Sequence, residues 1–279
     1  MKAAAFAYER PTDLNAALAL MARANGTAKI IAGGQSLGPM LNLRLVEPDL
    51  IIDISGLSEL KFAERRGDEL VIGACVTHGD IEDGRIPDVT RGAMQRVAGA
   101  IAYRAVRNRG TIGGSLSHAD PAADWVSVLS ALGAKVALRS AVQARDLLIE
   151  EFVTGALESA LHPGEILEAV RVPALTSSAR WGYVKACRKS GEFAHAIAAV
   201  LIDPEQATAR AVIGALQAAP LVLNDAAALF GGQVTGDFKQ QFDPRVADAI
   251  LTKAGVANAA DRHIHVTVLR RAISEAASA

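Results

Sequence analysis

The chain contains few aromatic residues, little net charge and only two cysteines. Aromatic side chains make up 4% of the 279 positions, too few for the base-stacking surfaces of proteins that bind single-stranded nucleic acid. The net charge of −1 provides no broad positive field for a polyanion. These features predict no nucleic-acid partner and favour a small molecule or a protein.

Cys75 and Cys187 are far apart in the sequence, and no Cys-x-x-Cys pair occurs. Because an iron–sulfur cluster usually requires four thiolates, this chain cannot hold one alone. We expect two free thiols in a reducing compartment. No apolar run approaches the ~20 residues of a membrane span, and charged residues interrupt the N-terminal apolar stretch. We therefore expect a cytoplasmic protein with no transmembrane segment and no signal peptide.

The length exceeds the usual ~100–200 residues per domain, which predicts two domains. Residues 1–176 mix strand-like and helix-like stretches, whereas residues 177–279 place strands before helices, a pattern typical of an α+β unit. The first helix is expected to start at a Thr12 cap and to stop at Asn25-Gly26. The other expected helices cover 88–100, 122–133, 224–231, 243–255 and 264–278. The expected strands cover 28–34, 48–55, 69–76, 134–140, 166–173, 180–190, 195–203 and 209–217.

Two glycine pairs occur in similar surroundings, in AGGQS at 32–36 and in TIGGS at 111–115. Each follows an apolar, strand-like stretch and precedes small polar residues. Glycine lacks a Cβ, so another group can approach its main-chain N–H, and successive N–H groups in such a turn form an anion site. Two such turns suit a dinucleotide pyrophosphate. The alternative is that each pair forms only a tight turn. Neither the Rossmann nor the P-loop pattern is present, so a phosphate site here would be of another kind.

A polar cluster follows the second glycine pair and offers two further hypotheses. A metal site is disfavoured because Pro121 interrupts the spacing of His118, Asp120 and Asp124, with no second His or Cys nearby. A triad of Ser115, His118 and Asp120 is disfavoured because triads form between residues distant in sequence. We expect Asp120 to be a helix cap or turn residue, and Asp124 to lie in the first helical turn, where a carboxylate is favourable.

Several basic residues permit two interpretations each. Arg104, Arg107 and Arg109 precede the second glycine pair and either neutralise phosphate or occupy an ordinary surface turn. Lys185 alternates with apolar residues, as a solvent-facing strand residue does.

The histidines show no metal-binding pattern. His78 and His195 are expected to be structural or surface residues. His263 and His265 lack a neighbouring Cys or carboxylate motif, so we expect no metal there either.

Four stretches together resemble one protein family. They are AGGQSLGPMLNLRL, VRNRGTIGGSLSHADPAADW, LHPGEILEAVRVP and YVKACRKSGEFAHAIAAV. The chain resembles, along its whole length, the FAD-binding medium subunit of molybdenum hydroxylases of the aerobic carbon monoxide dehydrogenase type. The resemblance implies a two-part FAD-binding domain of the vanillyl-alcohol-oxidase (PCMH) type at 1–176. A smaller C-terminal domain with an antiparallel sheet is implied at 177–279.

The resemblance also implies which residues contact FAD, with the pyrophosphate between the two glycine motifs. These residues are Ala32, Gly33, Gly34, Gln35, Ser36, Ile101, Thr111, Ile112, Gly113, Gly114, Ser115, Asp124, Leu167, Lys185 and Phe193. Phe193 stands where a carbon monoxide dehydrogenase would be expected to have Tyr, so a role that needs a phenol is not implied. No metal ligand and no acid–base residue is implied in this chain.

The function implied by the resemblance is electron transfer through FAD. A large partner subunit would oxidise substrate at a molybdopterin cofactor, and a small partner would relay electrons through two 2Fe-2S clusters. This chain would pass them to quinone, oxygen or another acceptor, in a dimer of heterotrimers that could contact the inner face of the membrane through its partners. Two alternatives remain open: a self-contained flavin oxidase and a non-catalytic scaffold subunit.

Overall fold

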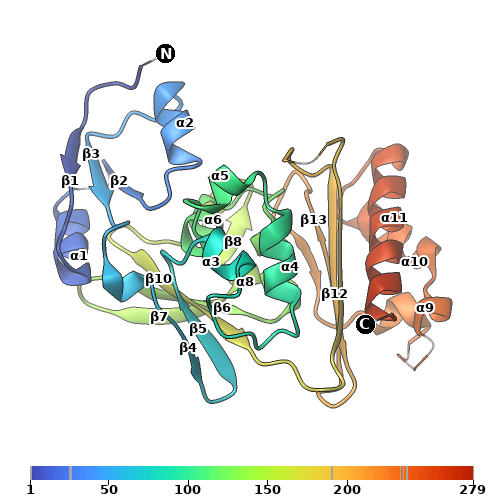
Figure 1. Cartoon of the computed structure of the whole chain (residues 1–279). Coiled ribbons are helices and arrows are strands. Elements are labelled where there is room, and N and C mark those ends of the chain that lie inside the picture. Colours follow the sequence, from blue (N-terminus) through green and yellow to red (C-terminus); the bar gives the residue numbers. More distant parts are fainter. Residues whose placement is uncertain are drawn as a thin grey trace.

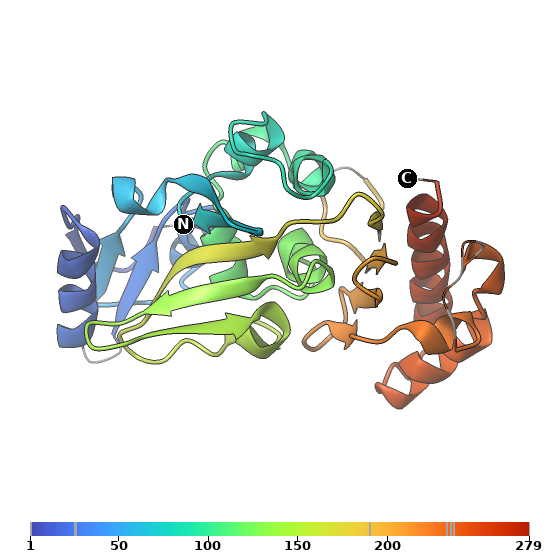
Figure 2. The same ribbon diagram turned by 90° about the horizontal axis from the view of Figure 1, so that it is seen from below.

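The structure, a computed structural model, describes residues 2–24, 27–189, 191–232, 234, 236 and 238–278. Three blocks follow one another in chain order, from a small N-terminal block through a central block to a C-terminal block (Figure 1). The view turned by 90° shows the same order, with the C-terminal helices at the end away from the N-terminal block (Figure 2). The predicted α+β class is confirmed.

The N-terminal block is a small parallel sheet. Its elements are β1 (Ala7–Glu9), α1 (Leu14–Arg23), β2 (Ala28–Ile31), α2 (Leu37–Asn42) and β3 (Leu50–Asp53). Both β1 and β2 pair in parallel with β3. The predicted cap at Thr12 is wrong by one residue, because the carboxylate of Asp13 accepts the N–H of Ala16 at 2.8 Å. The predicted stop at Asn25-Gly26 lies outside the described residues.

The central block is an antiparallel sheet of order β4-β5-β10-β6-β7 with helices beside it. Its elements are η1 (Ser58–Leu60), β4 (Ala63–Arg66), β5 (Glu69–Gly73), α3 (His78–Glu82), α4 (Ala93–Ala100), α5 (Arg104–Arg107), α6 (Ile112–His118), α7 (Asp124–Ala131), β6 (Lys135–Arg139), β7 (Ala144–Leu148), α8 (Ile149–Phe152), β8 (Val153–Gly155), β9 (Glu158–Ser159) and β10 (Ile166–Pro173). The helix expected over 88–100 starts only at Ala93. The carboxylate of Asp88 accepts the N–H groups of Thr90 and Gly92 and holds the preceding residues as a turn.

The C-terminal block is an antiparallel sheet of order β11-β12-β13-β14 followed by helices. Its elements are β11 (Arg180–Ala186), β12 (Ala196–Asp203), β13 (Thr208–Gly214), β14 (Leu221–Leu223), η2 (Ala227–Phe230), α9 (Phe238–Gln241), α10 (Pro244–Lys253) and α11 (Ala259–Ala276). The helix expected over 224–231 is only the short 3-10 turn η2. Along β12, Ala198 and Val200 face the apolar cluster under α11. Ile197 and Ala199 point the opposite way, into the central core.

Helix α7 joins the central and C-terminal blocks. All eight of its residues are buried, and it packs against both β12 and β13. A Cβ at Gly214 would overlap the hydroxyl of Ser127, so β13 lies directly against this helix. The predicted domains therefore share a hydrophobic core, and their boundary at 176/177 stays a prediction.

Candidate functional site

One cavity of about 640 Å³ is lined by residues from all three blocks. Of the residues that the sequence assigned to FAD, all except Ile112 line it. Ile112 is fully buried in the central core beneath the second glycine motif. Its expected contact with FAD therefore finds no support in the geometry.

The first glycine motif is a turn between β2 and α2. Gly34 has φ of +70°, a conformation that suits glycine, and the side-chain amide of Gln35 donates to the carbonyl of Gly33 at 2.9 Å. Within the described part of the chain, no protein acceptor takes the main-chain N–H groups of Gly34, Gln35 or Ser36. These donors are available to an anion at the cavity wall.

The two glycine motifs lie against each other at Gly33. A Cβ there would overlap the carbonyl oxygen of Arg109 and would come within 2.8 Å of the Cα of Gly110. The missing side chain therefore lets one protein segment approach another. We expected the approaching group to be a ligand, and at Gly33 it is another part of the chain.

The second glycine motif is the first turn of helix α6. Thr111 is the N-cap, and its hydroxyl accepts the N–H of Gly114 at 3.0 Å. The N–H of Ile112 donates to Val76, and that of Gly113 donates to Ala74. We expected these N–H groups to be free for phosphate, and this expectation is wrong. The segment before the motif is also helical (α5), not a strand.

What the second motif presents to the cavity is hydroxyl groups. Thr111 and Ser115 line the wall, and so does Ser117, which follows the motif. Since a hydroxyl both donates and accepts, Thr111 can cap the helix and still donate its proton to a ligand.

An ion pair lies at another part of the wall, where the C-terminal sheet meets α7. The ammonium of Lys185 lies 2.7 Å from the carboxylate of Asp124 and also donates to the carbonyl of Ala100 at 2.8 Å. The hydroxyl of Tyr183 donates to the same carboxylate. Burial and the Asp124 charge raise the pKa of Tyr183 well above its ordinary value, so it remains a donor. The strand pattern had suggested that Lys185 faces solvent. Its ammonium instead points to Asp124 and to the carbonyl of Ala100.

Apolar side chains complete the cavity. Ile101 and Leu167 line it from the central block, and Phe193 lines it from the segment between β11 and β12. Phe193 is 72% exposed, an unusual state for a phenylalanine. In the same segment, Gly191 lies directly against the ring of Tyr103.

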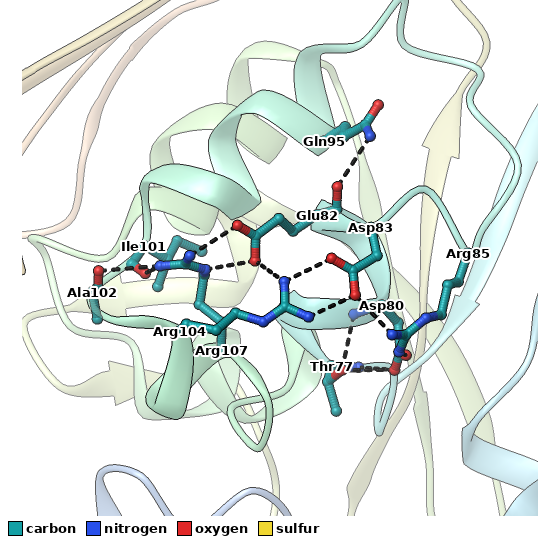
Figure 3. Close-up of polar contacts among 10 residues, drawn as sticks. All are labelled: Thr77, Asp80, Glu82, Asp83, Arg85, Gln95, Ile101, Ala102, Arg104 and Arg107. Atoms are coloured by element: carbon teal, nitrogen blue, oxygen red, sulfur yellow. Dashed lines mark hydrogen bonds and ion pairs between the residues drawn. The ribbon is translucent and has the colours of Figure 1, made fainter.

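Arg104 and Arg107 are engaged by carboxylates on helix α3 and the residue after it. Figure 3 shows the guanidinium of Arg104 bonded to both Glu82 and Asp83, and that of Arg107 bonded to Glu82. Arg107 also donates to the carbonyls of Ile101 and Ala102 at 2.9 and 3.2 Å. Neither arginine lines the cavity, so the geometry does not support phosphate neutralisation. Nor do they occupy an ordinary surface turn, because both lie on helix α5 and form ion pairs with Glu82 or Asp83.

Polar residues that the sequence analysis had interpreted otherwise also line the cavity. They are His78, expected to be structural or on the surface, Asp120, expected to be a cap or turn residue, and His118, for which a metal or triad role was disfavoured. Asp120 does form the expected turn, since its carboxylate accepts the N–H of Ala122 at 2.8 Å. Among the residues that the structure describes, no group of three or more His, Cys, Asp or Glu side chains is arranged to hold a metal ion.

Comparison with known protein families matches residues 4–175 to the FAD binding domain in molybdopterin dehydrogenase. The chain belongs to this family. Caffeine dehydrogenase subunit beta of Pseudomonas sp. (strain CBB1) is 38% identical over 206 residues, which are 74% of this chain and 70% of that protein. The carbon monoxide dehydrogenase medium chain of Hydrogenophaga pseudoflava is 34% identical over 197 residues, or 71% and 69% of the two chains.

Solved structures agree over the whole length. Carbon monoxide dehydrogenase from Hydrogenophaga pseudoflava superimposes with a TM-score of 0.89 at 29% identity, covering 100% of this chain and 99% of that one. Quinoline 2-oxidoreductase from Pseudomonas putida 86 gives 0.86 at 29% identity with the same coverage. The resemblance inferred from sequence is confirmed, and with it the FAD-binding fold followed by an antiparallel C-terminal sheet. The chain is an FAD-binding subunit of the molybdenum hydroxylase type.

The residues present fit FAD. The cavity joins free main-chain donors in one motif to hydroxyl groups in the other, as two linked phosphates require. The aromatic and aliphatic wall elsewhere suits an apolar ring system. No described helix is both long and apolar enough to cross a membrane.

Proposed function

We propose that this chain holds FAD in the cavity and transfers electrons from iron–sulfur clusters of a small partner subunit to an external acceptor such as quinone or oxygen. A large partner would oxidise the substrate at its molybdopterin cofactor. The observation that carries the proposal is the meeting of the two glycine motifs at one wall of a cavity that Asp124 and Lys185 line as well.

Each part of the wall has its own task in this proposal. Gly34, Gln35 and Ser36 would donate main-chain N–H groups to the pyrophosphate, while Thr111 and Ser115 would donate hydroxyls. The carboxylate of Asp124 and the ammonium of Lys185 would hold each other in position beside the ring system. When bound, FAD supplies the redox chemistry, and the protein positions it and tunes its potential.

The substrate is selected on a partner subunit, so this chain does not determine it. The similar proteins are named for caffeine, carbon monoxide and quinoline, which share no single chemistry. We propose a dimer of heterotrimers in the cytoplasm, reaching the inner face of the membrane only through its partners. Residues 1–176 would form the FAD-binding domain and residues 177–279 the C-terminal domain.

The test uses the purified complex with its partners. The complex is reduced with dithionite and mixed with a quinone analogue, and cluster reoxidation is followed by visible absorbance. We expect fast reoxidation with FAD, slow reoxidation after FAD is removed, and recovery when FAD is added back. Equal rates with and without FAD would support the scaffold alternative. Oxidation of an organic substrate by the isolated chain would support the self-contained oxidase.

A further inference from the structure

His78 is a buried histidine at the start of helix α3 that none of the predicted ligand contacts includes. Its side chain is turned inward, with 5% of the residue exposed, and it lines the cavity. Its main-chain N–H donates to the carbonyl of Gly110 at 2.9 Å, which ties it to the segment entering the second glycine motif.

The hydrogen bond from Trp125 determines which nitrogen of His78 carries the proton. The indole N–H of Trp125 lies 3.0 Å from Nδ1 of His78. An indole nitrogen only donates, so Nδ1 must accept, and the proton of the neutral ring is on Nε2. Trp125 is fully buried in the central core, which holds this arrangement in place.

The ring also stays neutral. Burial, with a smaller contribution from the charge of Arg107, lowers the pKa of His78 from 6.5 to about 4. At neutral pH the side chain is therefore a neutral donor with a fixed tautomer.

The Nε2–H group lies where the two glycine motifs meet. A Cβ at Gly110 would be 2.9 Å from Nε2 of His78, and Gly110 is also the residue against which Gly33 packs. Within the described residues, Nε2 has no hydrogen-bond partner, and protein atoms do not enclose it completely. A donor without a protein acceptor, next to the motif junction and on a residue that lines the cavity, is suited to a ligand oxygen.

We propose that His78 is a further FAD-binding residue, which donates its Nε2–H to the pyrophosphate as a neutral hydrogen-bond donor. This inference rests on the proposed function. It also explains the histidine–tryptophan pair: the bond from Trp125 keeps the donating proton on Nε2, next to Gly110.

The test compares FAD and riboflavin, which lacks both phosphates, on the full chain by flavin fluorescence titration. His78→Asn keeps an acceptor for Trp125 but removes the Nε2 donor. Losing a hydrogen bond to a charged group predicts FAD binding about 10- to 100-fold weaker, with riboflavin binding unchanged. His78→Gln, whose amide reaches further toward the cavity, should recover part of the loss.

Unchanged FAD affinity in His78→Asn would overturn the inference while leaving the proposed function intact. Equal losses for FAD and riboflavin would overturn it too, because the residue would then act on the ring system or on the fold. Failure of the wild-type chain to bind FAD at all would instead contradict the proposed function, and the inference with it.

A second measurement needs no variant that could fail to fold. Wild-type chain labelled with ¹⁵N at histidine is studied by NMR with and without FAD. The bound state should retain a neutral ring and show an Nε2–H proton newly protected from exchange with water. An Nε2 resonance unaffected by FAD would overturn the assignment.

Discussion

At the residue scale, the glycines act mainly on the protein itself. Gly33 and Gly113 lie so close to Arg109 and Ala74 that a side chain would overlap them. The sequence predicts where these glycines occur and that something approaches closely. It does not reveal that the neighbour is another part of the chain, because that contact joins segments far apart in sequence.

Gly33→Ala should separate the two glycine motifs. The added methyl group cannot fit against the carbonyl of Arg109, so we expect a loss of about 1–3 kcal/mol in unfolding free energy. FAD binding should weaken as well. Gly38→Ala is the matched control, because nothing lies within 4 Å of that position on helix α2. Its stability should stay equal or rise slightly. Equal effects of the two changes, measured by chemical denaturation and FAD titration, would contradict the packing argument.

The buried state of His78 predicts a pH dependence of stability. Its pKa is 6.5 in the unfolded chain and about 4 in the fold, so the unfolded state binds the proton first as pH falls. Stability from this group is complete above pH 6.5 and decreases by about 3 kcal/mol as the pH is lowered toward 4. His78→Asn does not titrate, so its stability deficit against wild type should shrink over that window. A constant deficit from pH 7 to 4 in urea titrations would show that the ring is not buried in its neutral form.

At the element scale, α3 and α5 are joined by the ion-pair cluster shown in Figure 3. Arg107, whose side chain is only 12% exposed, binds Glu82 and holds the carbonyls of Ile101 and Ala102. Ala102 has φ of +42°, a strained value for alanine, so this corner of the cavity depends on that support.

Arg107→Ala should therefore cost about 2 kcal/mol of unfolding free energy and speed the release of FAD. Arg85→Ala is a fair comparison, because Arg85 pairs with Asp80 and Asp83 of the same cluster but is 62% exposed. Exposed pairs contribute little, about 0–1 kcal/mol. If the two variants lose the same stability and release FAD at the same rate, the hydrogen bonds from Arg107 to Ile101 and Ala102 do not contribute to FAD binding.

The longest strands and helices follow from sequence, though not all of their ends, whereas shorter elements such as α2, α3, α6 and β7 were not expected. The strand over 166–173 is predicted to the residue, because a mainly apolar run, interrupted only by Glu168 and Arg171 and ended by Pro173, suits a central strand such as β10. The start of α4 was missed because the Asp88 turn competes with helix for the same backbone groups. The roles of Arg104 and Arg107 also could not be predicted, since their carboxylate partners lie on another helix.

At the scale of the whole molecule, the cavity and the core both cross the predicted domain boundary. Helix α7 is buried on all sides, and β12 and β13 cover it from the C-terminal part. Periodicity in the sequence identifies such a helix but not the sheet that covers it. The two-domain prediction therefore describes the order of the elements along the chain. It does not describe how the chain unfolds, because the two parts share one core.

A fragment of residues 1–176 should not be stable alone. Without β12 and β13, the apolar face of α7 would be open to water, and the fragment would lack Lys185 and Phe193 at the cavity. We expect aggregation, or a broad thermal transition without FAD binding, whereas the full chain unfolds cooperatively. A monomeric fragment that unfolds sharply and binds FAD as tightly as the full chain would show that the first domain is autonomous.

The most direct test of the central claim is a crystal structure of the chain with FAD. We expect the pyrophosphate at the junction of the two glycine motifs, within hydrogen-bonding distance of the N–H groups of Gln35 and Ser36 and of the hydroxyl of Thr111. The ring system should lie beside Asp124 and Lys185. FAD bound elsewhere, or with its phosphates away from this junction, would contradict the account.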